Sequence, residues 1–198
     1  DGIIQFVQDI DIDPMDVLVL MLLYKLDSKV QYRISRQEWT SGFNTHRIQN
    51  LDEMKSKIPA FRTQINSSAK SFKQFYNWCF SYVKERDQKG MAIEVACQTW
   101  RVILADKFDL LDDWCNFMQV EVGKAVQKDT WDLFLDFVQQ VGGDLSKFDE
   151  GGAWPVAVDE FVAWMKEGKN VAVRERLQKE AEEAAAAAAN DGEAQEEE

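Results

Sequence analysis

The sequence predicts an all-α protein whose helices form two lobes, and three observations support this prediction. Apolar residues recur at helical spacing through most of the chain, whereas alternating runs long enough for a β-strand are lacking. With 45% hydrophobic and 12% aromatic residues in 198 positions, the chain has enough apolar side chains for a substantial core. Residues 93–104 show the helical spacing most clearly, through Ile93, Ala96, Cys97, Trp100, Ile103 and Leu104.

Residues 1–66 are predicted to form an N-terminal helical lobe. Residues 1–10 have the pattern of a short amphipathic helix, and Asp13-Pro14 marks the start of a second one. This second helix, MDVLVLMLLYKL, is apolar almost all round, so we expect it to be buried on most sides.

The segment that follows, DSKVQYRISRQE, has the outline of a degenerate EF-hand loop. Such a loop has twelve residues, beginning with Asp and ending with Glu, as Asp27 and Glu38 do here. Lys29, Gln31 and Tyr32 occupy positions where the loop requires carboxylates and a glycine. We therefore expect a helix-loop-helix that keeps the EF-hand shape without binding calcium.

Two pairs of residues are typical of capping boxes at helix N-termini. Ser35 precedes Glu38 by three residues, and Asn50 stands in the same relation to Glu53. A helix is expected to begin after each pair. Pro59 should interrupt the second of these helices early, because proline removes a backbone donor.

Residues 67–166 are predicted to form a C-terminal helical lobe. An aromatic helix begins near Ser71, and apolar residues between positions 110 and 118 continue the pattern. KDTWDLFLDFVQQV is the next predicted helix, with Asp129 as its N-cap. Its apolar positions are Trp131, Leu133, Phe134, Phe137 and Val138. After a glycine-rich acidic connection, Pro155 is predicted to lie in the first turn of the last helix of the lobe.

The composition changes after Lys166. Residues 167–198 are rich in Ala and Glu, and apolar residues are sparse after Leu177, so we expect an acidic tail in which a frayed helix leads into disorder. The whole chain carries a net charge of −12. This charge argues against sequence-independent nucleic-acid binding, which requires a basic surface, and favours a basic partner.

Residues suited to nucleophilic or metal chemistry are few. Cys79, Cys97 and Cys115 fall within apolar-faced helices, while the single histidine, His46, falls in a polar connecting segment. Zinc-ligand spacing and a glycine-rich phosphate loop are both absent from the sequence. We therefore expect a non-enzymatic binding protein with no cofactor and no metal.

The sequence also predicts a cellular setting. No apolar run approaches the ~20 residues that a membrane span requires, and the odd number of unpaired cysteines fits a reducing compartment. We expect a soluble intracellular protein, located in the nucleus and cytoplasm. Because the chain begins at Asp1 rather than at Met, we also expect a segment to precede it.

Four motifs carry a resemblance to a known family. KDTW, LDF, FDEGGAWP and VDEFV stand in the order and at the spacing of the potentiating-neddylation domain. Residues 1–166 resemble this domain, which defines the defective-in-cullin-neddylation family. The resemblance implies that Asp129, Ala153 and Asp159 dock the C-terminal winged-helix region of a cullin. Taken alone, Asp129 is better explained as an N-cap and Asp159 as an early-helix acid, and only the family resemblance favours docking.

The resemblance implies a second site, an apolar pocket for the acetylated N-terminus of the conjugating enzyme. Acetylation removes an α-amino charge whose burial would be unfavourable. The positions implied for this pocket are Ile3, Met15, Val19, Leu22, Gln31, Tyr82, Val95, Thr99 and Val102. By helical spacing alone, Val19, Leu22 and Val102 are as well explained as ordinary core residues.

The family implies a monomeric scaffold component of a ligase. It would promote neddylation, the transfer of a ubiquitin-like modifier from its conjugating enzyme to a cullin lysine, by binding both proteins. The reacting cysteine would belong to the conjugating enzyme. An alternative from the residues themselves is a degenerate EF-hand adaptor that binds a basic amphipathic helix.

Overall fold

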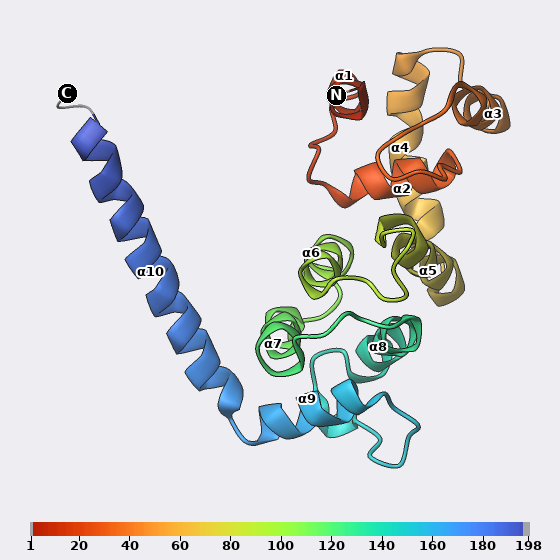
Figure 1. The fold of residues 1–198 in the computed structure, drawn as a ribbon. Helices are drawn as coiled ribbons and strands as arrows, with labels where there is room; N and C mark the ends of the chain where they lie inside the picture. Colours follow the sequence, from red (N-terminus) through yellow and green to blue (C-terminus); the bar gives the residue numbers. More distant parts are fainter. Residues whose placement is uncertain (1, 196–198) are drawn as a thin grey trace.

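The prediction of an all-α fold is confirmed by the computed structural model, which describes residues 2–195, with side chains up to residue 185 (Figure 1). Within that range the β contacts are two isolated bridges, Val30–Arg33 and Met91–Val126. The α-helices are α1 (Gly2–Asp9), α2 (Val17–Lys25), α3 (Arg36–His46), α4 (Leu51–Ile65), α5 (Ala69–Val83), α6 (Ile93–Leu104), α7 (Leu111–Phe117), α8 (Lys128–Val141), α9 (Val156–Lys166) and α10 (Lys169–Gln195). A π-helix, Met118–Val122, follows α7, and a 3-10 helix, Leu145–Lys147, follows α8.

The helices are stacked in chain order. Figure 1 shows α1–α4 at the top, α5 and α6 in the middle and α7–α9 below, while α10 projects away from the body. One apolar cluster runs through all of these layers. At its centre the rings of Trp100 and Trp131 stack with centroids 5.0 Å apart, and those of Trp114 and Phe134 stack at 4.1 Å. These rings join the middle and lower helices.

The helix predicted over residues 93–104 forms with those limits, as α6. Its six predicted apolar residues are all buried. In α8, Leu135 is buried where Leu133 was expected, and Leu133 is only half-buried. The predicted face was therefore right except at this pair of positions.

The second helix begins later than expected, at Val17. Asp16, not Asp13, is its N-cap, since the Asp16 carboxylate accepts a hydrogen bond of 2.8 Å from the Leu18 N–H. Asp13 instead accepts from the Met15 N–H, at 2.8 Å, in the preceding turn. The next residues of α2, 19–23, are all buried, as the apolar run predicts.

The acidic residues at the two ends of the loop between α2 and α3 are paired with other groups of the same loop. The Asp27 carboxylate pairs with the Lys29 ammonium. The Glu38 carboxylate accepts hydrogen bonds from the backbone N–H groups of Lys29 at 2.8 Å and Ser35 at 2.7 Å. Tyr32, at the position of the EF-hand glycine, has a left-handed backbone with φ of 51°. The two carboxylates predicted to open and close the loop are thus satisfied by the chain itself.

The predicted capping boxes form in different ways. Ser35 and Glu38 make the complete reciprocal box at the start of α3. Asn50 caps α4 as expected, accepting a hydrogen bond of 2.9 Å from the Glu53 N–H. The Glu53 carboxylate, however, accepts from the Gln49 N–H at 2.7 Å, one residue before the cap.

The prediction that Pro59 interrupts this helix is wrong, because α4 continues from Leu51 to Ile65 with Pro59 inside it. Four apolar residues at helical spacing keep one side of α4 in the core on both sides of the proline, namely Met54, Ile58, Phe61 and Ile65. Pro59 itself is exposed, so the carbonyl that lacks a helical donor is on the solvent side.

The packed body extends into α10, past the expected start of the tail at residue 167. Val173 is buried and Leu177 is half-buried against the core. Arg174 forms two hydrogen bonds to the fully buried carboxylate of Asp113 in α7, one of them 2.6 Å long from Nε. Residues 196–198, the end of the segment expected to be disordered, lie outside the described residues. None of the described helices is long and apolar enough to cross a membrane.

Candidate protein-binding sites

The connection between α8 and α9 is a structured loop that presents Ala153. The carbonyl of Asp149 accepts hydrogen bonds from the Gly152 N–H at 3.0 Å and from the Trp154 indole at 2.9 Å. A Cβ atom at Gly152 would lie 2.4 Å from the Trp154 ring nitrogen, so glycine is needed for this close approach. Glu150 pairs with Lys166 at 2.6 Å, which fastens the loop to the end of α9. Ala153 is left exposed.

Asp129 is the second residue of α8 rather than its N-cap, which is Gln127. The prediction of Asp129 as N-cap is therefore wrong, although its carboxylate accepts a hydrogen bond of 2.8 Å from the next backbone N–H, that of Thr130. The side chain is exposed. Two other aspartates of α8 are paired, Asp132 with Lys128 and Asp136 with Lys73 from α5. Among the described ion pairs none involves Asp129.

Asp159 lies in the first turn of α9 and is exposed. Pro155 comes just before the helix, one position earlier than predicted, and its carbonyl accepts from the Val158 N–H at 2.8 Å. Asp159, like Asp129, has no ion-pair partner among the described side chains. Its position suits the positive end of the helix dipole.

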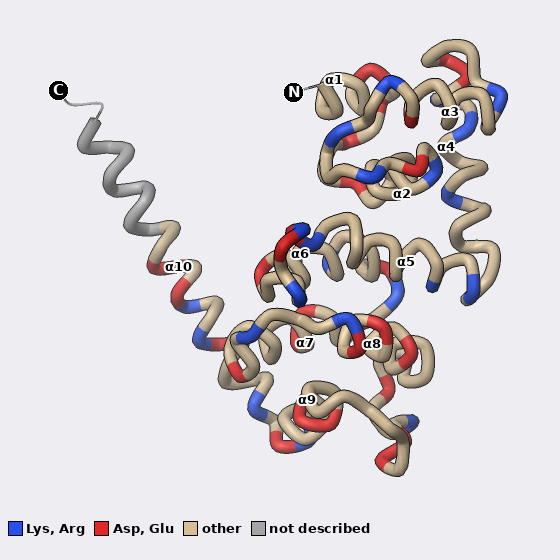
Figure 2. Tube along the Cα trace, turned by 45° about the vertical axis from the view of Figure 1, so that its right-hand side comes forward, with Lys and Arg blue, Asp and Glu red and all other residues tan. Residues whose placement is uncertain are grey.

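The three residues implied for docking are exposed on three neighbouring elements. Phe137 of α8 packs against Trp154 of the loop, with ring centroids 6.1 Å apart, and against Phe161 of α9 at 6.2 Å. Asp129 thus lies on the helix that packs against the loop and α9, which carry Ala153 and Asp159. Figure 2 shows acidic positions along both helices. The surface offers two unpaired carboxylates and a small side chain.

A cavity of about 240 Å³ lies between the start of α2, the loop after it, the end of α5 and α6. Six of the nine residues implied for the pocket line it, namely Met15, Val19, Gln31, Val95, Thr99 and Val102. Six further residues that the sequence did not suggest complete the lining, namely Pro14, Asp16, Leu20, Tyr32, Val83 and Gln98.

The remaining three residues do not line this cavity. Leu22 is 1% exposed and belongs to the core. Ile3 lines a second hollow of about 440 Å³, which shares Tyr32 with the first. The hydroxyl of Tyr82 accepts a hydrogen bond of 2.9 Å from the Tyr32 N–H and donates one of 3.2 Å to the Val30 carbonyl. Tyr82 therefore supports the cavity wall through Tyr32.

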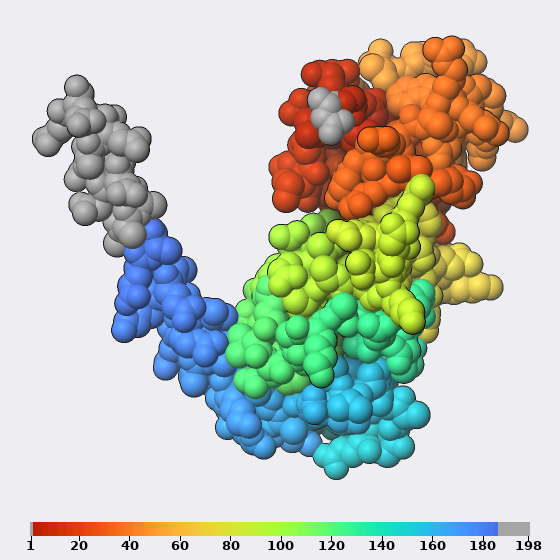
Figure 3. Space-filling view, viewed as in Figure 1, coloured from red at the N-terminus to blue at the C-terminus, as the bar shows by residue number. Residues whose placement is uncertain are grey.

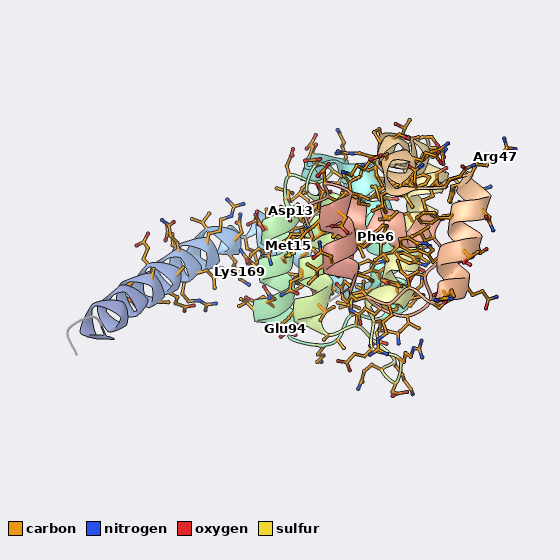
Figure 4. All side chains as sticks on the ribbon, turned by 90° about the horizontal axis from the view of Figure 1, so that it is seen from above. Phe6, Asp13, Met15, Arg47, Glu94 and Lys169 are labelled. Carbon is orange, nitrogen blue, oxygen red and sulfur yellow. The ribbon has the colours of Figure 1, made fainter. Side chains whose placement is uncertain are left out.

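The lining of the cavity is mostly apolar and includes no Lys or Arg. Met15, which lines the cavity, is 78% exposed, and Figure 4 labels it beside Asp13. The Thr99 hydroxyl already donates to the Val95 carbonyl, at 2.7 Å. Gln31 and Gln98 are the two residues of the lining with side-chain amides. An uncharged peptide end would find both an apolar wall and hydrogen-bonding amides here.

The three cysteines of the chain lie in the core. Burial raises the pKa of the Cys79 thiol. Cys97 and Cys115 each donate to the other's carbonyl, at 3.7 and 3.8 Å, and hydrogen bonding to Cys97 together with burial raises the pKa of Cys115. His46 is the last residue of α3, not part of a connecting segment, and half-buried: its Nε2 is 2.9 Å from the Lys25 carbonyl. Each of these four side chains is held by packing or hydrogen bonds.

An all-α fold with exposed, unpaired carboxylates on α8 and α9 and a largely apolar cavity beside α2, α5 and α6 is typical of a protein-binding module. A family model described as cullin binding matches residues 53–164, and the chain belongs to this family of DCN1-like proteins. The human DCN1-like protein 5 is 30% identical over 166 residues, which cover 84% of this chain and 70% of the relative.

Relatives of a second type are similar to the same extent. The DCN1-like protein 4 of Drosophila melanogaster is 32% identical over 166 residues, covering 84% of this chain and 66% of the relative. The DCN1-like protein 4 of Danio rerio is 31% identical over 167 residues, covering 84% of this chain and 59% of the relative. The family resemblance inferred from the four motifs is confirmed.

Proposed function

We propose that this chain is a scaffold component of a neddylation ligase. It binds a cullin through Asp129, Ala153 and Asp159, and it binds the acetylated N-terminus of the conjugating enzyme in the cavity beside α6. The modifier then passes from the conjugating enzyme's cysteine to a cullin lysine. The protein acts as a monomer in the nucleus and cytoplasm and contributes no catalytic group of its own.

The observation that carries the proposal is the state of the carboxylates on α8. Asp132 and Asp136 are neutralised by lysines of this chain, whereas Asp129, on the same helix, and Asp159, on α9, are exposed and keep their charge free. Free carboxylates form charge-assisted hydrogen bonds with Lys or Arg of a partner. Ala153, exposed on the loop between α8 and α9, leaves room for the partner's backbone to approach.

A titration of a cullin C-terminal domain tests the docking site. The wild-type chain is compared with Asp129→Lys, Ala153→Arg and Asp159→Lys, and circular dichroism establishes that each variant folds. We expect each variant to weaken binding by about 2 kcal/mol or more, because each places a like charge or a bulky group at the contact. Asp52→Lys, a reversal at an exposed position on α4, is the matched control. Equal binding by all variants would contradict the docking site.

The cavity fits an acetylated N-terminus for a physical reason. A free α-amino group is charged at neutral pH, and the described lining contributes one carboxylate, that of Asp16, which already accepts the Leu18 N–H. Acetylation removes the charge and adds an amide that Gln31 or Gln98 can bond. The acetylated form should therefore bind and the free amine should not.

Calorimetry with a synthetic peptide of the conjugating enzyme's N-terminus tests this second contact. We expect acetylation to tighten binding at least tenfold. Val102→Glu, which adds a charge to the lining, should abolish binding, while Val171→Glu, at a 54% exposed position on α10, should not. Equal affinity of both peptide forms would contradict the role given to the cavity.

The two contacts promote transfer by holding the reactants together. Simultaneous binding makes the second encounter intramolecular and raises the effective concentration of the thioester-bearing enzyme near the cullin. The chain thereby accelerates the reaction through position alone.

A further inference from the structure

The outward face of α9 carries four exposed residues, Val156, Asp159, Glu160 and Ala163. Asp159, Glu160 and Ala163 follow Val156 by three, four and seven residues, so all four lie along one side of the helix. The opposite side is buried, through Val158, Phe161 and Val162. We call the four exposed residues the α9 stripe.

Val156 begins the stripe and is unusually exposed. At 70% exposure it exceeds every large apolar side chain described as exposed except Met15, at 78%. Met15 lines the cavity, the other proposed binding site. The two most exposed large apolar residues in the described chain therefore fall at the two proposed contacts.

Glu160 gives the stripe a second negative charge, and Ala163 allows a partner to approach the helix closely. Glu160 has no ion-pair partner among the described side chains, and Lys166, the basic residue in the last turn of α9, is held by Glu150 at 2.6 Å. Ala163 is small and exposed, which lets another backbone approach the helix. An apolar residue beside two free carboxylates fits a partner surface that combines an apolar recess with basic side chains.

We propose that the α9 stripe extends the cullin-docking surface beyond Asp159, with Val156 as its apolar anchor and Glu160 as a further carboxylate for a basic residue of the cullin. This inference rests on the proposed function, since it takes the cullin as the partner. It is supported by the continuity of the stripe with Asp159 and Ala153 and by the charge expected of the partner. Desolvation of Val156 by the partner would strengthen the neighbouring charge pairs.

The same cullin titration tests the stripe with substitutions that leave the helix intact. Val156→Ser removes the apolar side chain at the exposed first residue of α9. Ala163→Gln adds bulk with a residue that favours helix. We expect each variant to bind about tenfold more weakly than wild type, and Glu160→Lys more weakly still.

Matched variants on α10 serve as controls. Val171→Ser and Ala172→Gln make the same changes at exposed positions of a different helix, and both should bind like wild type. Unchanged binding by Val156→Ser and Ala163→Gln, beside a loss with Asp159→Lys, would overturn the stripe and leave the proposed function standing. An absence of binding by the wild-type chain would overturn both.

Discussion

At the scale of single residues, aspartates have different roles according to the groups that surround them. Asp16 caps a helix, Asp113 is buried against Arg174, and Asp129 is exposed and free. All three stand in or next to the first turn of a helix, where an acid is favoured on local grounds. Asp16 and Asp129 each accept one backbone N–H, so what sets the proposed docking residue Asp129 apart is its exposed position without an ion-pair partner among the described side chains.

Glu38 provides a prediction about pH. Burial raises the pKa of this carboxyl, but hydrogen bonds from Ser35 and the Lys29 backbone outweigh it, so the folded pKa lies below the ordinary value of 4.5. A group whose pKa is depressed in the folded state stabilises the fold above its unfolded pKa, and this contribution is lost as the pH falls through the folded pKa. Because solvent screens this largely accessible carboxylate, Glu38→Gln should lower the free energy of unfolding by only about 0.5 kcal/mol at pH 7.

Urea denaturation at several pH values measures this effect. The difference between wild type and Glu38→Gln should shrink as the pH is lowered from neutral to below 4.5. Glu85→Gln, at an exposed position between α5 and α6, is the control and should show little difference at any pH. A difference for Glu38→Gln that stays constant with pH would refute the assignment.

At the scale of secondary-structure elements, packing decides where helices continue and where they end. The core-facing side of α4 carries the helix through Pro59, and the contacts of Val173 and Arg174 hold the first turns of α10 to the body. Figure 3 shows the rest of the described part of α10 standing away from the packed helices. From local propensity alone, α4 was expected to end early and α10 to make no contact with the body.

Replacing Pro59 by alanine should stabilise the protein. A proline inside a helix costs about 3 kcal/mol, and part of the gain is offset by about 1 kcal/mol because alanine makes the unfolded chain more flexible. We expect Pro59→Ala to raise the free energy of unfolding by about 2 kcal/mol in a denaturant titration. Pro155→Ala, just before α9, should bring no such gain, because no hydrogen bond within the helix is restored there. A loss of stability with Pro59→Ala would show that the proline relieves a strain elsewhere.

The link between Asp113 and Arg174 should be necessary for docking α10. Arg174→Ala leaves a fully buried carboxylate without its partner and should lower the free energy of unfolding by about 2–3 kcal/mol. Asp113→Asn in the same chain removes the stranded charge and should recover part of the loss. A double-mutant cycle by urea denaturation measures the coupling between them. Additive effects of the two substitutions would contradict the pair.

At the scale of the whole molecule, the two proposed sites belong to different helices of one packed body. The cavity is built from α2, α5 and α6, while the docking surface is built from α8, α9 and the loop between them. The Tyr76 hydroxyl connects α5, α6 and α8, because it donates to the Trp131 carbonyl and accepts from the Trp100 indole, both at 2.8 Å. Buried hydrogen bonds of this kind favour a fixed separation between the sites.

A scaffold of this kind should work only when both sites are on one molecule. In a reconstituted transfer assay, Asp159→Lys and Val102→Glu should each reduce modification of the cullin to near the rate without scaffold. A mixture of the two variants should remain equally slow, since the gain comes from intramolecular encounter. Recovery of the rate by the mixture would show that the two contacts act independently.

The sequence by itself determined the features that depend on residues within a few turns of one another. The period of α6, the capping box at Ser35 and the four motifs of the family are all local, so the fold class, the family and the implied docking residues could be read without coordinates. Six of the nine residues implied for the pocket also line one cavity. Local pattern was sufficient for the helices, because periodicity and caps are set by neighbouring residues, whereas the docking and pocket residues followed from the family resemblance.

Only the tertiary structure decided which of these residues are free to bind. Asp113 meets an arginine 61 positions away, Tyr82 holds a backbone group 50 positions away, and Leu22 is enclosed by the core instead of lining the cavity. The continuation of α4 through Pro59 likewise depends on helices that pack against it. Burial and ion pairing are properties of residues brought together from distant parts of the chain, and no local pattern fixes them.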